Sequence, residues 1–162
     1  MLAAQREGNR LFTESLQHLG LTTSQAEALR VLEQWAPVSL VELGSLLVCE
    51  HGSPSRLVAA LIAAGYVERT LSPNDRRKVV LTLTSRGRDA TAQVRAAEAA
   101  LHAALSALVS DQEVADVLPI IRRIVSGRPA GDALARRLGR LPLLSLDSPA
   151  YESAQKENDR HA

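Results

Sequence analysis

The residues best suited to bind a charged partner are three consecutive cations, Arg76, Arg77 and Lys78, in the stretch SPNDRRKVVLTL. They follow turn-forming residues at 73–75 and precede a run rich in β-branched residues, a pattern typical of a hairpin tip. Arginine at such a tip can enter the minor groove of DNA, where the negative potential is enhanced. A basic hairpin can also be an ordinary solvated turn, and the choice between these two interpretations depends on the neighbouring elements.

A second set of candidates lies at the start of the helix predicted in SPSRLVAALIAAG. Ser53 is suited to cap this helix, Pro54 to its first position, and Gly65 to the left-handed residue that ends it. Hydroxyl and guanidinium groups at a helix start can bind phosphates and base edges, although Ser53 can act as a cap alone. The candidates here are Ser53, Ser55 and Arg56.

The elements that would position these residues form a recognisable series. Thr22 and Gln25 have the spacing of a capping box for a helix that ends before Pro37. Ser39 and Glu42 repeat this spacing before a short helix with leucines on one face. A tight connection then leads to the helix at 53–65, which predicts a helix-turn-helix, and the hairpin that follows would be its wing.

The remaining segments are predicted to be helical, at 1–19, 84–109 and 110–125, and Pro119 is expected to kink the last of these. Apolar residues occupy most of the circumference of this last helix, more than one monomer layer would cover. They indicate a dimer surface, with ordinary intramolecular core as the alternative. These residues are Val114, Val117, Leu118, Ile120, Ile121, Ile124 and Val125.

Composition supports this organisation. Aromatic residues make up only 2% of the 162-residue chain, so a core of Leu, Val, Ile and Ala is expected, in a mostly α fold with a small β-hairpin wing. Residues 50–88 carry seven cations against three acidic residues, so positive charge is concentrated around the hairpin. With one cysteine, no signal peptide and no apolar run of membrane length, we expect a cytoplasmic protein.

Four stretches together resemble the winged helix-turn-helix regulators of the multiple antibiotic resistance regulator (MarR) family. They are LTTSQAEALRVL, SLVELGSLL, SPSRLVAALIAAGYVER and NDRRKVVLTLTSRG, within a resemblance that covers residues 1 to about 126. The resemblance implies a winged helix-turn-helix at 21–83 and a helical dimerisation region at 1–20 and 84–126. Residues 127–162 would be a C-terminal extension, partly flexible or clasping the dimer.

The resemblance also implies roles for individual residues. The helix at 53–65 would read the major groove, and Asp75 would fix the shape of the wing by pairing with an arginine. Arg69 and Lys78, on the strands, would position phosphates or merely solubilise the wing. The full set of predicted DNA-binding residues is Ser53, Ser55, Arg56, Arg69, Asp75, Arg76, Arg77 and Lys78.

The function expected from this combination is sequence-specific regulation of transcription. The protein would be a homodimeric repressor on a near-palindromic operator in double-stranded DNA, released by a small anionic or phenolic effector. The alternative is a winged-helix module that binds an acidic protein without reading DNA sequence. An enzyme is not expected, because phosphate loops, nucleophile elbows and paired carboxylates are missing from the sequence.

Three smaller questions concern ligands. The helices that would line an effector pocket contain Arg10, Phe12, His18 and Trp35, although a lone tryptophan can equally belong to the core. The four histidines share no metal-ligand spacing, so no metal and no cofactor are expected. Cys49, beside the helix at 53–65, is either a redox sensor or a small buried hydrophobic residue.

Overall fold

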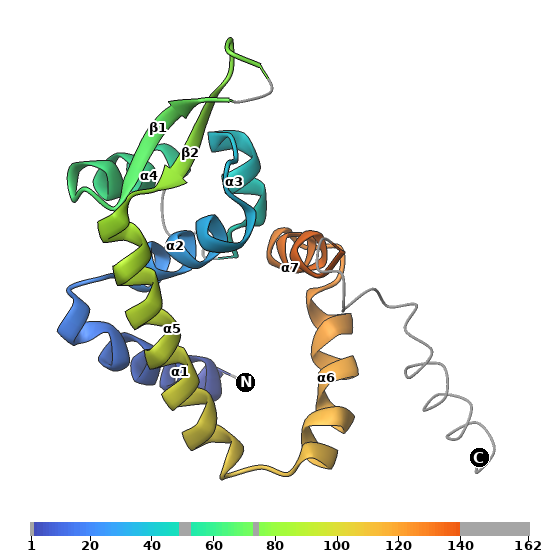
Figure 1. Cartoon of the computed structure of the whole chain (residues 1–162). Coiled ribbons are helices and arrows are strands. Elements are labelled where there is room, and N and C mark those ends of the chain that lie inside the picture. The colour runs from blue at the N-terminus through green and yellow to red at the C-terminus, as the bar shows by residue number, and fades with distance from the viewer. Residues whose placement is uncertain (1, 49–52, 73–74, 140–162) are drawn as a thin grey trace.

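The computed structural model describes residues 2–48, 53–72 and 75–139. The predicted tail beyond 139, Cys49 and the turn residues 73–74 lie outside this part of the chain. The elements follow the predicted order, with helices arranged around a two-stranded hairpin (Figure 1). They are α1 (Leu2–Leu16), the 3-10 helix η1 (Gln17–Leu19), α2 (Thr23–Trp35), α3 (Leu40–Leu46), α4 (Pro54–Ala63), β1 (Val67–Leu71), β2 (Val79–Leu83), α5 (Ser85–Ser106), α6 (Asp111–Val125) and α7 (Pro129–Gly139).

Capping boxes define where three of the helices begin, and the first two are those that the sequence predicts. The Thr22 hydroxyl accepts a hydrogen bond from the Gln25 amide, and the Gln25 side chain accepts one from the Thr22 amide. Ser39 with Glu42 and Ser110 with Glu113 form the same reciprocal pairs before α3 and α6. Each box satisfies backbone donors that a helix start leaves unpaired, so the boundaries of α2, α3 and α6 are set locally.

The hairpin is antiparallel and in the register Val67↔Leu83 to Leu71↔Val79. An isolated bridge joins Val38, between α2 and α3, to Leu81 on the inner strand, with the Leu81 amide donating to the Val38 carbonyl at 2.8 Å. The sequence does not predict this bridge. Because β2 is bonded on both sides, the wing is attached to the start of the helix-turn-helix as well as to α5.

One core lies where α1, α2, α3, α4, the hairpin and the first half of α5 meet. It is aliphatic, as the composition predicts. The buried members of α2 include Ala26, Leu29, Val31 and Leu32. Leu2, at the start of α1, is exposed. Other large side chains that are almost fully buried are Leu16, Leu43, Leu46, Val58, Leu61, Val67 and Val94.

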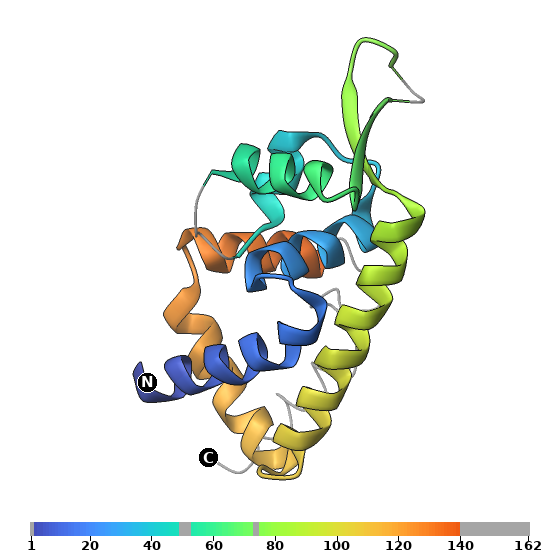
Figure 2. The same ribbon diagram turned by 90° about the vertical axis from the view of Figure 1, so that its left-hand side faces the viewer.

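Helix α5 runs the length of the molecule, from the base of the wing to the turn into α6 (Figures 1 and 2). Leu105 near its C-terminal end and Leu108 in the turn that follows are exposed apolar residues. Helix α6 continues through Pro119 to Val125, and α7, which the sequence does not predict as a separate helix, packs against α3 and α6. Across the described residues, we find no helix with the length and apolar character needed to span a bilayer.

Candidate nucleic-acid interface

Helix α4 begins as predicted, but its capping differs from expectation. Ser53 occupies the N-cap position and Pro54 the first turn, yet the Ser53 hydroxyl makes no capping hydrogen bond. The Ser53 carbonyl instead accepts the amides of Arg56 at 2.9 Å and Leu57 at 3.2 Å. The side chains of Ser53, Ser55 and Arg56 are all exposed, so the Ser53 hydroxyl is open to a ligand.

The end of α4 fixes how the helix joins the wing. Gly65 has the predicted left-handed backbone, with φ of 74°. The Gly65 amide donates to the Ile62 carbonyl and the Tyr66 amide to the Leu61 carbonyl, each at 2.9 Å, which is the hydrogen-bond pattern of a Schellman motif. The chain therefore reverses tightly from α4 into β1, and the two elements hold a defined orientation.

The exposed face of α4 contains residues that the sequence reasoning missed. Val58 and Leu61 are fully buried and attach the helix to the core. The opposite side, beyond Ser55 and Arg56, consists of the exposed alanines Ala59, Ala60 and Ala63. The sequence could have indicated this exposed face, because the alanines recur at helical spacing on the side of the helix that Val58 and Leu61 do not occupy.

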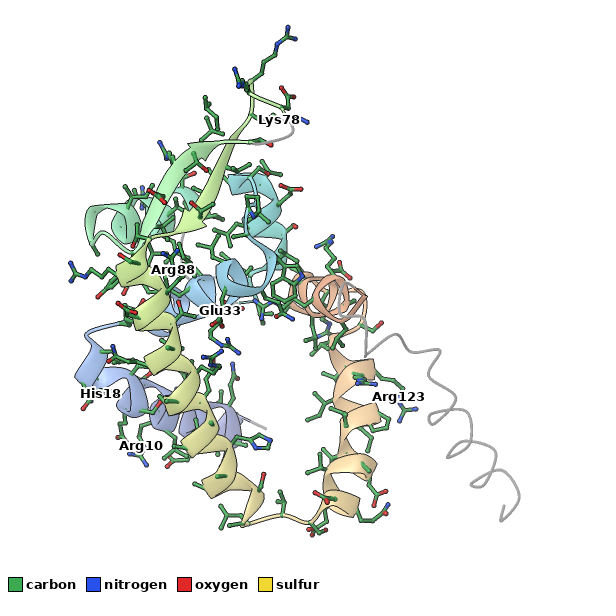
Figure 3. All side chains as sticks on the ribbon, in the orientation of Figure 1. Arg10, His18, Glu33, Lys78, Arg88 and Arg123 are labelled. Atoms are coloured by element: carbon green, nitrogen blue, oxygen red, sulfur yellow. The ribbon has the colours of Figure 1, made fainter. Side chains whose placement is uncertain are left out.

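The tip of the hairpin carries the three cations into solvent. Arg76, Arg77 and Lys78 are exposed, and Figure 3 shows Lys78 at the far end of the wing. Within the part of the chain that the structure describes, the guanidinium groups of Arg56, Arg76 and Arg77 take part in no hydrogen bond or ion pair. These cations are therefore available to a polyanion without first breaking an internal contact.

Asp75 shapes the wing through the backbone, which differs from the expected pairing with an arginine side chain. Its carboxylate accepts the Arg77 amide at 3.0 Å, and its carbonyl accepts the Lys78 amide at 2.9 Å. The charged partner is Lys78, with 3.8 Å between Nζ and Oδ2, and the Lys78 side chain remains 74% exposed. Asp75 thus holds a turn in which its own charge is directed at Lys78, and the two arginine side chains stay free.

The remaining cations near the wing divide into exposed and engaged groups. Arg69 is exposed on β1 opposite Leu81. Arg86 lies over the ring of Tyr66, with 5.0 Å to the ring centroid, and Arg88 donates to the Leu83 carbonyl at 2.8 Å. These last two stabilise the junction between the wing and α5, whereas Arg69 adds to the exposed charge.

The views in Figures 1 and 2 place α4 and the wing at the same end of the molecule, opposite the turn between α5 and α6. Neither element is buried against the other along its exposed side. The structure therefore brings a helix with a polar, small-residue face and a cationic arm to one end of the fold. This arrangement can present a helix to a wide groove and an arm to phosphates or a neighbouring groove.

The four residues expected to line an effector pocket are not gathered in the single chain. Arg10 forms ion pairs with Glu7 and Glu14 on the exposed side of α1, which raise the pKa of Arg10 further above its usual value. His18 is exposed, as Figure 3 shows beside η1. Phe12 and Trp35 are half-buried and pack against the core.

An apolar groove lies instead along α6. It has a volume of about 440 Å³ and is lined by Val109, Glu113, Val114, Val117, Leu118 and Ile121. The other apolar side chains of α6 are also about half exposed, including Ile120 and Ile124. This surface is the one that the sequence predicts for dimerisation, and the single chain leaves it uncovered. No group of three His, Cys, Asp or Glu side chains forms a candidate metal site among the residues described.

Comparison with known proteins agrees with this geometry. A family model described as a winged helix DNA-binding domain matches residues 21–87. The multiple antibiotic resistance protein MarR of Escherichia coli is 35% identical over 79 residues, which is 49% of this chain and 55% of that protein. MarR of Salmonella typhimurium is 28% identical over 118 residues, or 72% of this chain and 82% of that protein. The match thus spans about half the length of the first relative.

Solved structures extend the likeness over more of the chain. A variant of Escherichia coli MarR complexed with operator DNA has a TM-score of 0.66 and 29% identity, covering 75% of this chain and 87% of that one. The transcriptional repressor CouR, bound to a 23-mer DNA duplex, has a TM-score of 0.64 and 26% identity, covering 76% and 89%.

The fold and the exposed α4 and wing define a winged helix-turn-helix protein. Within that class, the chain is similar to MarR proteins, at 28% identity over 72% of its length for the Salmonella typhimurium relative and 29% identity over 75% for the Escherichia coli structure.

Proposed function

We propose that the protein is a sequence-specific DNA-binding regulator of transcription, acting as a homodimeric repressor that a small molecule releases. The observation that carries this proposal is the pairing of an exposed α4 face with wing arginines whose side chains have no partner among the described residues. Solvated surface cations need no such arrangement, whereas a duplex requires a helix sized for its major groove and cations for its phosphates.

The side chains of α4 suit a close approach to base edges. Arg56 can donate two hydrogen bonds to a guanine or bind a phosphate, and Ser53 and Ser55 can donate to phosphates at the helix start. The alanines at 59, 60 and 63 keep the exposed face shallow, so the helix backbone can come near the bases. An alanine methyl can also contact the methyl group of thymine, which gives this face a preference for sequence.

The wing supplies the second contact. Arg76 and Arg77 extend from a turn whose shape Asp75 holds through the Arg77 amide. The arginines can enter the minor groove beside the major-groove site, while Arg69 and Lys78 are placed for phosphates along the strands. Each neutralised phosphate releases a condensed counterion, so the affinity should fall steeply as salt concentration rises.

A dimer would cover the apolar surface of α6 and match a near-palindromic operator. A two-fold axis repeats α4 and the wing, and the two copies of α4 can then read half-sites about 10 base pairs apart. In the single chain the apolar face of α6 and the end of α5 are exposed to water, and a second copy would bury them. A small anionic or phenolic effector bound between the dimerisation helices and the winged lobe would change the spacing of the two α4 helices and release the DNA. The proposed place of action is the cytoplasm.

The experiment that tests the function is selection of bound sites from random duplex DNA, followed by affinity measurements over a range of salt concentrations. We expect a near-palindromic consensus bound in the nanomolar range, with much weaker binding to random duplex. Enrichment of no sequence, with the affinity of an ordinary weakly basic protein for any duplex, would contradict the proposal. That result would favour the module that binds an acidic protein.

A further inference from the structure

Two arginines of α7 reach the end of α3, which is the first helix of the helix-turn-helix. Arg137 Nε donates to the Leu46 carbonyl at 2.6 Å, and Arg136 Nη1 donates to the Ser45 carbonyl at 3.1 Å. The last carbonyls of a helix have no partner within that helix, and a cation there is favoured by the helix dipole. Helix α7 therefore completes the C-terminal end of α3 with groups from more than 90 positions further along the chain, since each of these bonds spans 91 residues.

Arg137 also binds the Glu27 carboxylate, which accepts the Val48 amide just after α3. Its Nη2 donates to Glu27 Oε1, and Glu27 Oε1 accepts the Val48 amide at 2.8 Å. Both side chains are largely covered, with 20% of Arg137 and 12% of Glu27 exposed. A charge pair this well covered is weakly screened by salt, and removing one partner is more disruptive than removing a surface pair.

These hydrogen bonds form one network at the point where the chain leaves α3. Arg137 fixes the end of α3 through Leu46, and through Glu27 it fixes Val48, two residues later. Glu27 belongs to α2, so three helices meet at this point, and Figure 1 shows α7 beside them. Helix α4 packs directly on α3, so the contacts that fix the end of α3 also bear on the position of α4.

Helix α7 is in turn held close to α6. A Cβ atom at Gly131 would lie 2.0 Å from the Val125 carbonyl oxygen and 2.7 Å from its carbon, so no other residue fits without a shift of backbone. The Arg128 amide also donates to the Val125 carbonyl at 3.2 Å. The α6–α7 corner is therefore tight, and a displacement of α6 carries α7 with it.

We propose that Arg137 is a positioning residue, through which α7 links α6 to the start of α4, the proposed recognition helix. The link acts within the chain and rests on the proposed DNA-binding function, because its effect is read out as affinity for DNA. It predicts that losing the Arg137 contacts weakens operator binding although Arg137 itself does not touch DNA. It also assigns α7, the described part of the C-terminal extension, a role in setting the helix-turn-helix.

The test compares Arg137→Gln and Arg137→Lys with a matched control, Arg123→Gln. Arg123 is exposed on α6, points away from α5 in Figure 3, and makes no hydrogen bond or ion pair with the described residues. All variants are full-length and are first compared with wild type by circular dichroism and by dimer dissociation. Amide hydrogen exchange of residues 45–48 and affinity for the selected operator are then measured.

We expect Arg137→Gln to speed exchange at Val48 and to weaken operator binding about tenfold, a size typical of coupling between sites. Arg137→Lys keeps the charge but loses the forked geometry, so it should recover part of both effects. Arg123→Gln should match wild type in both measurements, and dimer dissociation should be the same in all variants.

A second substitution tests the α6–α7 corner. Gly131→Ala should displace α7 and reproduce the effects of Arg137→Gln, whereas Gly139→Ala, whose added Cβ has nothing within 4 Å, should not. Exchange and affinity unchanged in Arg137→Gln, or faster exchange with unchanged affinity, would overturn the positioning role. If the wild-type protein binds no DNA sequence selectively, the proposed function fails, and exchange at Val48 alone then decides whether Arg137 holds this connection.

Discussion

Gly87 lies directly against the backbone of Tyr66, so that a Cβ atom added at Gly87 would be 2.0 Å from the Tyr66 carbonyl oxygen. That carbonyl also accepts the Thr84 amide at 3.0 Å, and the Thr84 hydroxyl donates to the Gly65 carbonyl at 2.7 Å and accepts the Gly87 amide at 3.0 Å. Residues 83–87, the LTSRG stretch, therefore join the end of α4 to the start of α5. Gly87 is required because a larger residue would clash with the Tyr66 backbone. Thr84 is required because its hydroxyl bonds to both the Gly65 carbonyl and the Gly87 amide.

Replacing Gly87 with alanine should destabilise the fold. The added methyl group can be accommodated only by a shift of the Tyr66 backbone, and we expect a loss of about 3 kcal/mol in the free energy of unfolding. Urea unfolding followed by circular dichroism measures this loss. Gly8→Ala is the control, because a Cβ there has nothing within 4 Å and alanine favours the helix by up to about 1 kcal/mol. Equal stability of Gly87→Ala and wild type would contradict the close approach.

Removing either wing arginine should weaken DNA binding through lost charge. Arg76→Ala and Arg77→Ala are each expected to lower operator affinity and to reduce the slope of log affinity against log salt by about 1, if each arginine neutralises one phosphate. Fluorescence anisotropy at several salt concentrations gives both quantities. Arg123→Ala, an equal loss of charge on exposed α6, should leave the slope unchanged. A slope that falls equally in all three variants would point to a general effect of net charge.

A charge placed on the apolar face of α6 should disrupt the proposed dimer. Ile121 lines the groove on α6, and Ile121→Lys would bury an ammonium group in the interface. We expect the dimer dissociation constant to rise at least tenfold, which corresponds to about 1.4 kcal/mol. Sedimentation equilibrium measures it. Gln112→Lys makes the same charge change on the polar side of α6, where Gln112 bonds to Asp116, and should leave the dimer intact.

The capping box of α6 should depend on pH in the acid range. The Ser110 amide and then the Ser110 hydroxyl donate to Glu113, which lowers the pKa of Glu113 below its usual 4.5. The folded-state pKa is thus below the unfolded one, so the stabilisation is present above about pH 4.5 and is lost as pH falls through the lower folded value.

Carboxyl-resolved NMR titration checks this shift. In Ser110→Ala the pKa of Glu113 should move part of the way back toward 4.5, because the amide donor remains. A Glu113 pKa of 4.5 in the wild-type protein would show that the capping box does not form.

Local chemistry explains which features the sequence predicts. The capping boxes at Thr22 and Ser39 and the left-handed Gly65 depend on residues at most five positions apart, and all three are confirmed. The hairpin is confirmed for the same reason, since its strands are adjacent in the chain. Capping-box spacing and turn residues identify such elements because the interacting groups lie close together in sequence.

Features that depend on distant partners could not be predicted in this way. Nothing near Arg137 indicates a bond to Glu27, 110 positions away, and nothing near Val38 indicates the bridge to Leu81. At the candidate site, Ser53, Ser55, Arg56 and the wing cations are exposed as expected. Asp75 contacts Arg77 through the backbone amide rather than the guanidinium, because an amide competes well for a carboxylate two residues earlier.

Helix α5 is a single rod of 22 residues, about 33 Å long, anchored to β2 at one end and to α6 at the other. Such a rod works as a lever arm. A tilt of about 10° at the α6 end would move the wing by about 6 Å, which is about the width of the minor groove. In the proposed dimer, a small change of angle where the two subunits meet would therefore be enough to carry the wing arginines from one edge of that groove to the other.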